Sequence, residues 1–232
     1  MSGPRRFSEV SGYVLAGGAS RRMGMDKARL PVGSERMVDR QIRLLRALCR
    51  TVAIIGPPDR FPDAGIPVYE DEIPGQGPLG GLYTGLCKAR TEFSLFLSCD
   101  MPLMDARFLR YLCQQALTSR ASATVPTLGA KGAYPLCAVL RRGVLARVRA
   151  SLAMGQKRVG RFFAKAQRRT ISKAEFKRAG FSPRIFYNAN TPEDYESLRR
   201  QFEAPRQPTV MAEGKQWISA PTPGRARLGS AI

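Results

Sequence analysis

The stretch SGYVLAGGASRRMGMDK occupies residues 11–27. Its first part, residues 11–16, is a short apolar run that stops at Gly17 and Gly18, as a buried strand of a parallel sheet does before a turn. A loop rich in basic side chains follows and ends at Lys27. Because glycine has no Cβ, the N–H groups of Gly17 and Gly18 can approach a phosphate closely, and the cations beyond them can clamp a polyphosphate. The stretch therefore predicts a strand followed by a phosphate-binding loop.

An alternative interpretation of this loop is a tight turn whose basic residues are solvated. It is not a Walker A loop, because no Gly-Lys-Ser/Thr closes it. The strand end, the two glycines and the three cations Arg21, Arg22 and Lys27 together favour the phosphate site.

Strand-like and helix-like segments alternate along the chain beyond this stretch, which predicts an α/β fold: a three-layer αβα sandwich around a mainly parallel, Rossmann-like sheet. We expect one domain over residues 1–203. Residues 204–232 are rich in Pro, Gly and Ala without periodicity, which predicts a disordered tail. The expected strands are 11–16, 51–55, 66–70, 93–99, 123–126 and 134–140, and the expected helices are 37–49, 81–89, 106–117, 143–152, 157–167 and one that starts at Thr191.

The composition excludes several classes of enzyme. The chain has 232 residues, with 38 Lys and Arg against 18 Asp and Glu, and it contains no histidine. It therefore lacks the imidazole of Ser-His-Asp and Cys-His hydrolases and of histidine-bound zinc or iron sites. Hydrophobic residues make up 44% of the chain, which excludes disorder of the whole chain. Its chemistry must rest on carboxylates, Lys and Arg, amides and the backbone.

The net charge of +20 is concentrated in the second half: residues 1–120 carry +5 and residues 121–232 carry +15. Such an excess indicates an anionic substrate, a nucleic-acid surface or a solvated helix face. For the densest run, residues 156–169, we favour the solvated face, with Lys157 and Arg158 as exceptions. The aromatic residues of this half have core spacing and no nucleic-acid module is present, so a basic nucleic-acid-binding protein is the less favoured alternative.

Two acidic positions follow predicted strands. Asp100 comes directly after the strand 93–99, at the carboxyl end where α/β sheets bind ligands, and a lone carboxylate there suits Mg²⁺. The alternative is a helix cap. Residues 70–72, Glu-Asp-Glu, follow another strand and can either contact a nucleotide or form a solvated loop.

Two further loops carry small or amide residues. Residues 75–81 contain GxGxxG, but they do not follow the first strand and Pro78 interrupts them, so we expect a flexible loop over a flat ring rather than a dinucleotide site. The amides of Asn188 and Asn190 can bind a heterocycle, although the pattern alone favours an Asx-type turn before the Thr191 cap.

The five cysteines are widely spaced and form no CxxC pair, which indicates a reducing compartment. We expect Cys87, Cys99 and Cys137 to be buried thiols. Residues 1–10 have no apolar signal region, and no run approaches the ~20 apolar residues of a membrane span. A cytoplasmic protein is therefore expected.

Taken together, the run 15–27, Glu70-Asp71, residues 77–81, Cys99-Asp100-Met101-Pro102 and residues 188–192 resemble the molybdenum cofactor guanylyltransferase (MobA-type) family over about residues 10–200. The resemblance implies a fold of the nucleotide-diphospho-sugar transferase type. It also implies the reaction: GMP passes from GTP to the terminal phosphate of molybdopterin, pyrophosphate leaves, and Mg²⁺ is required. Molybdenum-insertion proteins and apo-molybdoenzymes are the implied partners.

The resemblance implies a role for each site residue. GTP is bound in a part spanning about residues 10–120, and molybdopterin in a part spanning about 121–203. Asp100, Lys27 and Arg22 are the implied catalytic residues, with Asp100 as the metal ligand. The implied GTP contacts are Leu15, Ala16, Gly17, Gly18, Lys27, Asp71 and Asp100, and the implied molybdopterin contacts are Lys157, Arg158, Asn188 and Asn190.

Two details bear on specificity. The chain has Leu-Ala-Gly-Gly at residues 15–18, whereas cytidine-specific relatives usually have Ala-Ala-Gly, so a cytidylyltransferase or a sugar-phosphate nucleotidyltransferase is the less favoured neighbour. The family often has an Asn where this chain has Gly56-Pro57-Pro58, which leaves one nucleotide contact unassigned. The missing histidine fits the reaction, because a phosphate monoester with a second pKa of ~6 is already a dianionic nucleophile at neutral pH.

Overall fold

The computed structural model describes residues 6–18, 26–127 and 134–203. Within them the chain forms a seven-stranded sheet in the order β5-β4-β1-β6-β8-β7-β9. Its strands are β1 (Phe7–Leu15), β4 (Cys49–Ile55), β5 (Val68–Tyr69), β6 (Phe93–Ser98), β7 (Ala123–Thr127), β8 (Cys137–Arg141) and β9 (Arg168–Ser172).

The sheet is mainly parallel, as predicted. β1 lies between β4 and β6 and pairs with both in parallel, with Tyr13 opposite Ala53 on one side and Phe96 on the other. Among the described strands of this sheet, β8 alone runs antiparallel to its neighbours β6 and β7. A separate two-stranded sheet pairs β2 (Pro31–Val32) with β3 (Glu35–Arg36).

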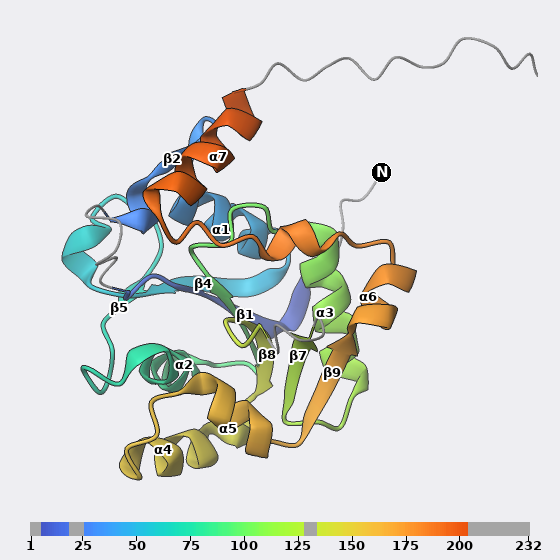
Figure 1. The fold of residues 1–232 in the computed structure, drawn as a ribbon. Helices are drawn as coiled ribbons and strands as arrows, with labels where there is room; N and C mark the ends of the chain where they lie inside the picture. The colour runs from blue at the N-terminus through green and yellow to red at the C-terminus, as the bar shows by residue number, and fades with distance from the viewer. Residues whose placement is uncertain (1–5, 19–25, 128–133, 204–232) are drawn as a thin grey trace, which may run out of the picture.

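Helices cover both faces of the large sheet, and each face has its own apolar core (Figure 1). On one face, α1 (Met37–Arg46), α3 (Ala106–Thr118) and α6 (Lys173–Arg178) contribute buried residues such as Leu45, Phe108 and Phe176. On the other, α2 (Gly77–Lys88), α4 (Leu145–Ala153) and α5 (Val159–Lys165) contribute Leu82, Val148 and Phe163. This arrangement confirms the three-layer α/β prediction.

A third, smaller cluster joins residues 30–37 to the last described helix. The helix α7 (Pro192–Glu203) packs Tyr195 and Leu198 against Val32 of β2 and against Met37. The Tyr195 hydroxyl donates to the carbonyl of Pro31 at 2.8 Å. The helix α7 therefore covers residues 30–37, which follow the loop that begins at Gly17 and Gly18.

The structure corrects several element predictions. α2 begins at Gly77, inside the segment 74–81 that was predicted to be a loop, and the predicted helix 157–167 ends at Lys165. The pairs β2–β3 and β9–α6 were not predicted. Cys87 is exposed and Cys99 is partly buried, whereas Cys137 is buried as expected. The predicted tail at 204–232 lies outside the described residues.

Candidate active site

A cavity of about 520 Å³ opens at the carboxyl ends of the central parallel strands. Leu15 ends β1, Ile55 ends β4, and Ser98 ends β6, and all three line the cavity. Ligands of open α/β sheets bind at this edge. The other lining residues are Ala16, Gly17, Gly18, Asp26, Lys27, Ala28, Asp71, Gly75, Gly77, Pro78, Gly81, Cys99, Asp100 and Leu136.

The double-glycine turn is held close to the end of β4. The N–H of Ala16 donates to the Ile55 carbonyl at 2.9 Å. A Cβ on Gly56 would lie only 3.1 Å from the carbonyl carbon of Ala16. A side chain at residue 56 would therefore force the strand end and the Ala16–Gly17 turn apart, which explains why glycine suits this position in this chain.

Lys27 is placed by a short 3₁₀ turn, η1 (Lys27–Arg29), whose cap is the Asp26 carboxylate accepting from the Ala28 N–H at 3.1 Å. The Lys27 Nζ donates to Oδ1 of Asn190 at 2.9 Å, across 163 residues of sequence. Lys27 thus lines the cavity beside residues 188–190, here called the asparagine loop. Arg21 and Arg22 lie outside the described residues.

Arg60, in the turn η2 (Pro58–Arg60), was missed by the sequence analysis. Its Nη1 donates to the carbonyl of Gly18 at 3.2 Å and lies 3.5 Å from that of Ala16, and its Nε is 3.5 Å from Oδ2 of Asp26. Arg60 therefore ties together the two flanks of residues 19–25. No local motif marks it, because its partners lie more than thirty residues away.

Asp100 follows β6 and lines the cavity, and one oxygen of its carboxylate lacks a hydrogen-bond partner among the described residues. This oxygen, Oδ1, is buried. The alternative role as a helix cap is wrong, because Asp105 caps α3 by accepting from the Arg107 N–H at 2.7 Å. An unsatisfied buried carboxylate oxygen is costly unless a cation completes it.

The backbone around Asp100 is fixed from outside. Three consecutive carbonyls, of residues 100, 101 and 102, accept from the Ala189 N–H at 3.2 Å, Gln41 Nε2 at 2.9 Å and Arg40 Nε at 2.6 Å. Gln41 is fully buried. The helix α1 and the asparagine loop therefore hold the backbone around Asp100 in place. No sequence motif predicts these hydrogen bonds.

These residues fit Mg²⁺. The described residues contain no group of three or more His, Cys, Asp or Glu side chains that could hold a metal by themselves. Mg²⁺ commonly uses one or two carboxylates and takes its remaining ligands from phosphates and water. The buried, unpaired Oδ1 of Asp100 provides such an oxygen.

Of the acidic residues 70–72, only Asp71 lines the cavity. Its carboxylate lies against three glycines: added Cβ atoms on Gly17, Gly80 and Gly81 would be 3.8–4.0 Å from its oxygens. Burial, and next the charge of Glu70, raise the pKa of Asp71 above its usual value. Glu72 instead pairs with Lys88 at 2.6 Å, outside the cavity lining.

The residues implied for molybdopterin come from two segments, the one between α4 and α5 (Lys157 and Arg158) and the asparagine loop (Asn188 and Asn190). Lys157 donates from Nζ to the Gly75 carbonyl at 3.0 Å, at the cavity rim, and its neighbour Arg158 is exposed. Asn190 reaches the cavity through Lys27, while Oδ1 of Asn188 is buried without a hydrogen-bond partner among the described residues. The structure thus brings Asn190 and Lys157 to the loops that line the cavity, and leaves Arg158 outside its lining.

The asparagine loop is ordered by the start of α7. The N–H groups of Asn190 and Thr191 donate to Oδ2 of Asp194 at 2.9 and 3.0 Å, and Thr191 Oγ1 accepts from the Asp194 N–H at 3.2 Å. These reciprocal bonds confirm the predicted Thr191 cap and form a capping box with Asp in the acidic position.

The family model that describes the MobA-like NTP transferase domain matches residues 12–171. The chain belongs to this family. A molybdenum cofactor guanylyltransferase from Syntrophotalea carbinolica is 34% identical over 203 residues, which cover 84% of this chain and 95% of that protein. The resemblance drawn from the sequence is therefore confirmed.

Solved structures confirm the fold. Molybdopterin-guanine dinucleotide biosynthesis protein A from Archaeoglobus fulgidus superposes with a TM-score of 0.71 at 16% identity, covering 82% of this chain and 97% of that one. A nucleotidyl transferase from Methanothermobacter superposes with a TM-score of 0.64 at 17% identity, covering 84% and 97%. Both support the predicted α/β transferase architecture.

Two broader expectations can be compared with the structure. Four aromatic rings of the basic half, those of Phe162, Phe163, Phe176 and Phe186, are at most 5% exposed, so these four offer no stacking platform for nucleic acid, whereas Phe181 and Tyr187 are partly buried. No helix among the described residues is long and apolar enough to span a membrane.

Proposed function

We propose that the chain is a molybdenum cofactor guanylyltransferase that transfers GMP from GTP to the terminal phosphate of molybdopterin and releases pyrophosphate. The observation that carries this proposal is a single cavity that joins the double-glycine turn, Lys27 and Asp100 at the carboxyl ends of β1 and β6. Family membership and the guanylyltransferase relative support it.

The glycine turn and Lys27 bind the triphosphate of GTP. The N–H groups of Gly17 and Gly18 face phosphate oxygens, and the Lys27 ammonium adds a positive charge. Leu15 and Ala16 line the nucleotide side of the same cavity. Asp71 contacts the nucleoside from between the glycines that surround its carboxylate. Arg22, and Arg21 before it, supply further charge from the loop.

Asp100 would hold Mg²⁺, and its Oδ1, which has no hydrogen-bond partner among the described residues, supports this role. When bound, the ion neutralises phosphate charge and stabilises the pyrophosphate that leaves. The backbone contacts of Gln41, Arg40 and Ala189 keep this carboxylate in one position. Such preorganisation is what in-line phosphoryl chemistry requires.

The transfer needs no general base. An oxygen of the molybdopterin phosphate attacks the α-phosphorus of GTP, and the bond from that phosphorus to the bridging oxygen of pyrophosphate breaks. The nucleophile arrives ionised, so the absence of histidine has no cost. Lys157, Arg158, Asn188 and Asn190 orient the molybdopterin side, with Asn190 adjoining Lys27 at the centre. We place this reaction in the cytoplasm, in keeping with the unpaired cysteines.

The proposal is tested by incubating the purified chain with molybdopterin, Mg²⁺ and either GTP or CTP, followed by mass detection of the dinucleotide. The guanine dinucleotide and pyrophosphate are expected with GTP and not with CTP. Equal or greater product with CTP would contradict the guanylyltransferase assignment while leaving a nucleotidyltransferase in place.

Asp100→Asn tests the metal ligand. The change keeps the side-chain size but removes the charge, so GMP transfer at saturating GTP should fall by at least ~100-fold. Circular dichroism should be unchanged, and the melting temperature should not fall, because a buried and unpaired charge is removed. Asp105→Asn is the matched control, because Asp105 caps α3 outside the cavity lining and should leave turnover within about twofold. A fully active Asp100→Asn enzyme would refute the role of Asp100.

A further inference from the structure

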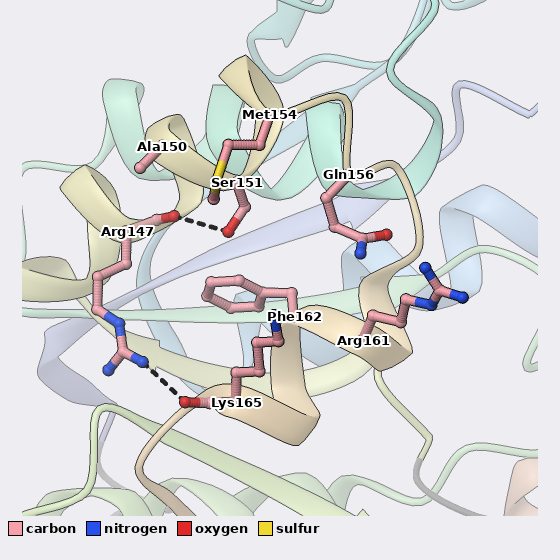
Figure 2. Close-up of a pocket in the computed structure, with 8 residues that line it drawn as sticks. All are labelled: Arg147, Ala150, Ser151, Met154, Gln156, Arg161, Phe162 and Lys165. Atoms are coloured by element: carbon pink, nitrogen blue, oxygen red, sulfur yellow. Dashed lines mark hydrogen bonds between the residues drawn. The ribbon is translucent and has the colours of Figure 1, made fainter.

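A second cavity, of about 400 Å³, lies between α4 and α5 and shares no lining residue with the active-site cavity. Figure 2 shows the Phe162 ring between the two helices, with Met154 and Ser151 on one side and Arg147 and Lys165 on the other. The full lining is Arg147, Ala150, Ser151, Met154, Gln156, Arg161, Phe162 and Lys165.

The cavity is lined by three basic side chains, and no described acidic side chain pairs with them. Arg147, Arg161 and Lys165 are exposed, and none of them forms an ion pair with another described residue. The Arg147 guanidinium donates to a backbone carbonyl, that of Lys165, at 2.8 Å, which leaves its charge unneutralised. The sequence contains no Asp or Glu between Asp105 and Glu175. The cavity therefore attracts an anionic group.

The cavity also has an apolar component. Phe162 is 5% exposed, so it forms a floor rather than a protruding ring. Met154 is 78% exposed, and it is the one large hydrophobic side chain in the described part of the chain with such exposure. A methionine is flexible and polarisable and adapts to the shape of an apolar partner group. An exposed apolar residue rimmed by cations marks an interaction site.

We propose that the α4–α5 cavity is a docking site for an acidic segment of a partner protein that inserts one apolar side chain against Phe162 and Met154. Carboxylates of the segment would pair with Arg147, Arg161 and Lys165. Charge complementarity and the mixed lining carry this choice of occupant.

Other occupants fit less well. Residues 204–232 of this chain carry four Lys or Arg and one Glu, and a second copy brings the same excess of positive charge, so both are repelled. Nucleic acid would find no exposed aromatic ring to stack on, since Phe162 is buried. A lipid surface is flat and does not enter a concave cavity.

The position of the cavity connects it to the active site. The segment between α4 and α5 holds Gln156, which lines this cavity, and Lys157, which contacts Gly75 at the rim of the other. A docked partner would lie beside the entrance for the second substrate. The docking proposal does not depend on the identity of that substrate.

The test uses the full chain and a fluorescently labelled peptide of eight glutamates with a central leucine, measured by anisotropy at physiological salt. Saturable binding is expected, weakened about tenfold by Arg161→Glu and by Met154→Glu, in keeping with residues central to an interface. Lys173→Glu, an equally large charge reversal at an exposed position of α6, should change the affinity by about twofold at most. GMP transfer should stay unchanged in all three variants.

Three results would overturn the proposal. The first is a lack of saturable peptide binding. The second is a result showing that net charge alone attracts the peptide. Lys173→Glu would then weaken binding as much as Arg161→Glu does, or a peptide with alanine in place of leucine would bind as tightly as the leucine peptide. The third is tighter binding of a thymidine oligonucleotide or of anionic phosphatidylserine vesicles with the same dependence on Arg161 and Met154. Melting curves establish that each variant is folded.

Discussion

At the scale of single residues, Asp71 lies in an environment that opposes its charge. Burial and the neighbouring Glu70 raise its pKa, and glycines pack around the carboxylate. Between the ordinary and the raised pKa the folded chain retains a proton that the unfolded chain has lost. Stability therefore falls as pH rises through this range and stays lower above it. Such a destabilising charge is typical of a residue kept for ligand binding.

Asp71→Asn should therefore raise the melting temperature at pH 8, and the gain should shrink as pH falls through the carboxyl range. GTP affinity should decrease in the same variant, because the nucleoside contact is lost. Melting curves across pH and a GTP titration measure both effects. A melting temperature that falls equally at all pH values would show that Asp71 is not destabilising.

Glu175→Gln is a control in which removing the charge should have the opposite effect on stability. The Arg169 guanidinium, and next the Tyr111 hydroxyl at 2.6 Å, hold the pKa of Glu175 below its usual range. Its charge therefore stabilises the fold above the unfolded pKa and loses this effect as pH falls. The variant should lose about 1–2 kcal/mol at neutral pH, and the loss should fade in acid.

The sequence was sufficient to predict those cavity-lining residues that belong to local motifs. Gly17, Gly18 and Lys27 follow a strand in a recognisable run, and Asp100 follows the end of another strand. Arg60 and Gln41 could not be found this way, because their roles consist of bonds to backbone carbonyls 42 and 60 residues away. Only the tertiary fold creates such contacts.

At the scale of elements, α2 packs on the sheet through a glycine. A Cβ on Gly85 would lie 2.4 Å from Cε1 of Phe96, whose ring is fully buried and stacks on Tyr13 at 5.4 Å. The ring cannot move without displacing β1 or β6. Glycine at this position therefore sets how closely the helix approaches the strands.

Gly85→Ala should lower the free energy of unfolding by about 1–2 kcal/mol, because overpacking outweighs the better helix propensity of alanine. Gly160→Ala in α5 is the matched control: nothing lies within 4 Å of its added Cβ, so stability should rise by about 0.5–1 kcal/mol. Urea denaturation measures both values. An equal gain in the two variants would contradict the close packing at Gly85.

Element prediction succeeded where burial gives a clear pattern and failed where polar residues form structure. β6 is buried along its whole length and was evident as an apolar run. β9 has the sequence RRTIS with only Ile171 buried, so its pairing with β7 has no apolar signature. The reversed direction of β8 also depends on its neighbours and on no property of its own residues.

At the scale of the whole molecule, segments that are far apart in the sequence meet at the candidate active site. α7 packs on the β2–β3 hairpin through Leu198, and its Asp194 holds the N–H of Asn190, whose side chain accepts from Lys27. The N–H of Ala189 in the same loop donates to the Asp100 carbonyl. The last described helix thus supports both the proposed phosphate-binding lysine and the proposed metal ligand.

Leu198→Ala should therefore have two consequences. Leu198 is fully buried, and its truncation should cost about 2–4 kcal/mol of stability. The loosened α7 should also raise the KM for GTP and speed hydrogen exchange at the Asn190 and Thr191 amides, at a temperature where the variant is still folded.

Leu152→Ala in α4 is a control that separates a loss of overall stability from a local change at the active site. Leu152 is 6% exposed and belongs to the core on the opposite side of the sheet, so its truncation should cost a similar amount of stability. Among the described residues, the hydrogen bonds that position Lys27, Asn190 and Thr191 involve no residue of α4. The KM for GTP and the exchange of those two amides should therefore stay unchanged in Leu152→Ala. If both variants changed the KM equally, the loss would follow from overall stability, and the packing of α7 would have no specific role in shaping the site.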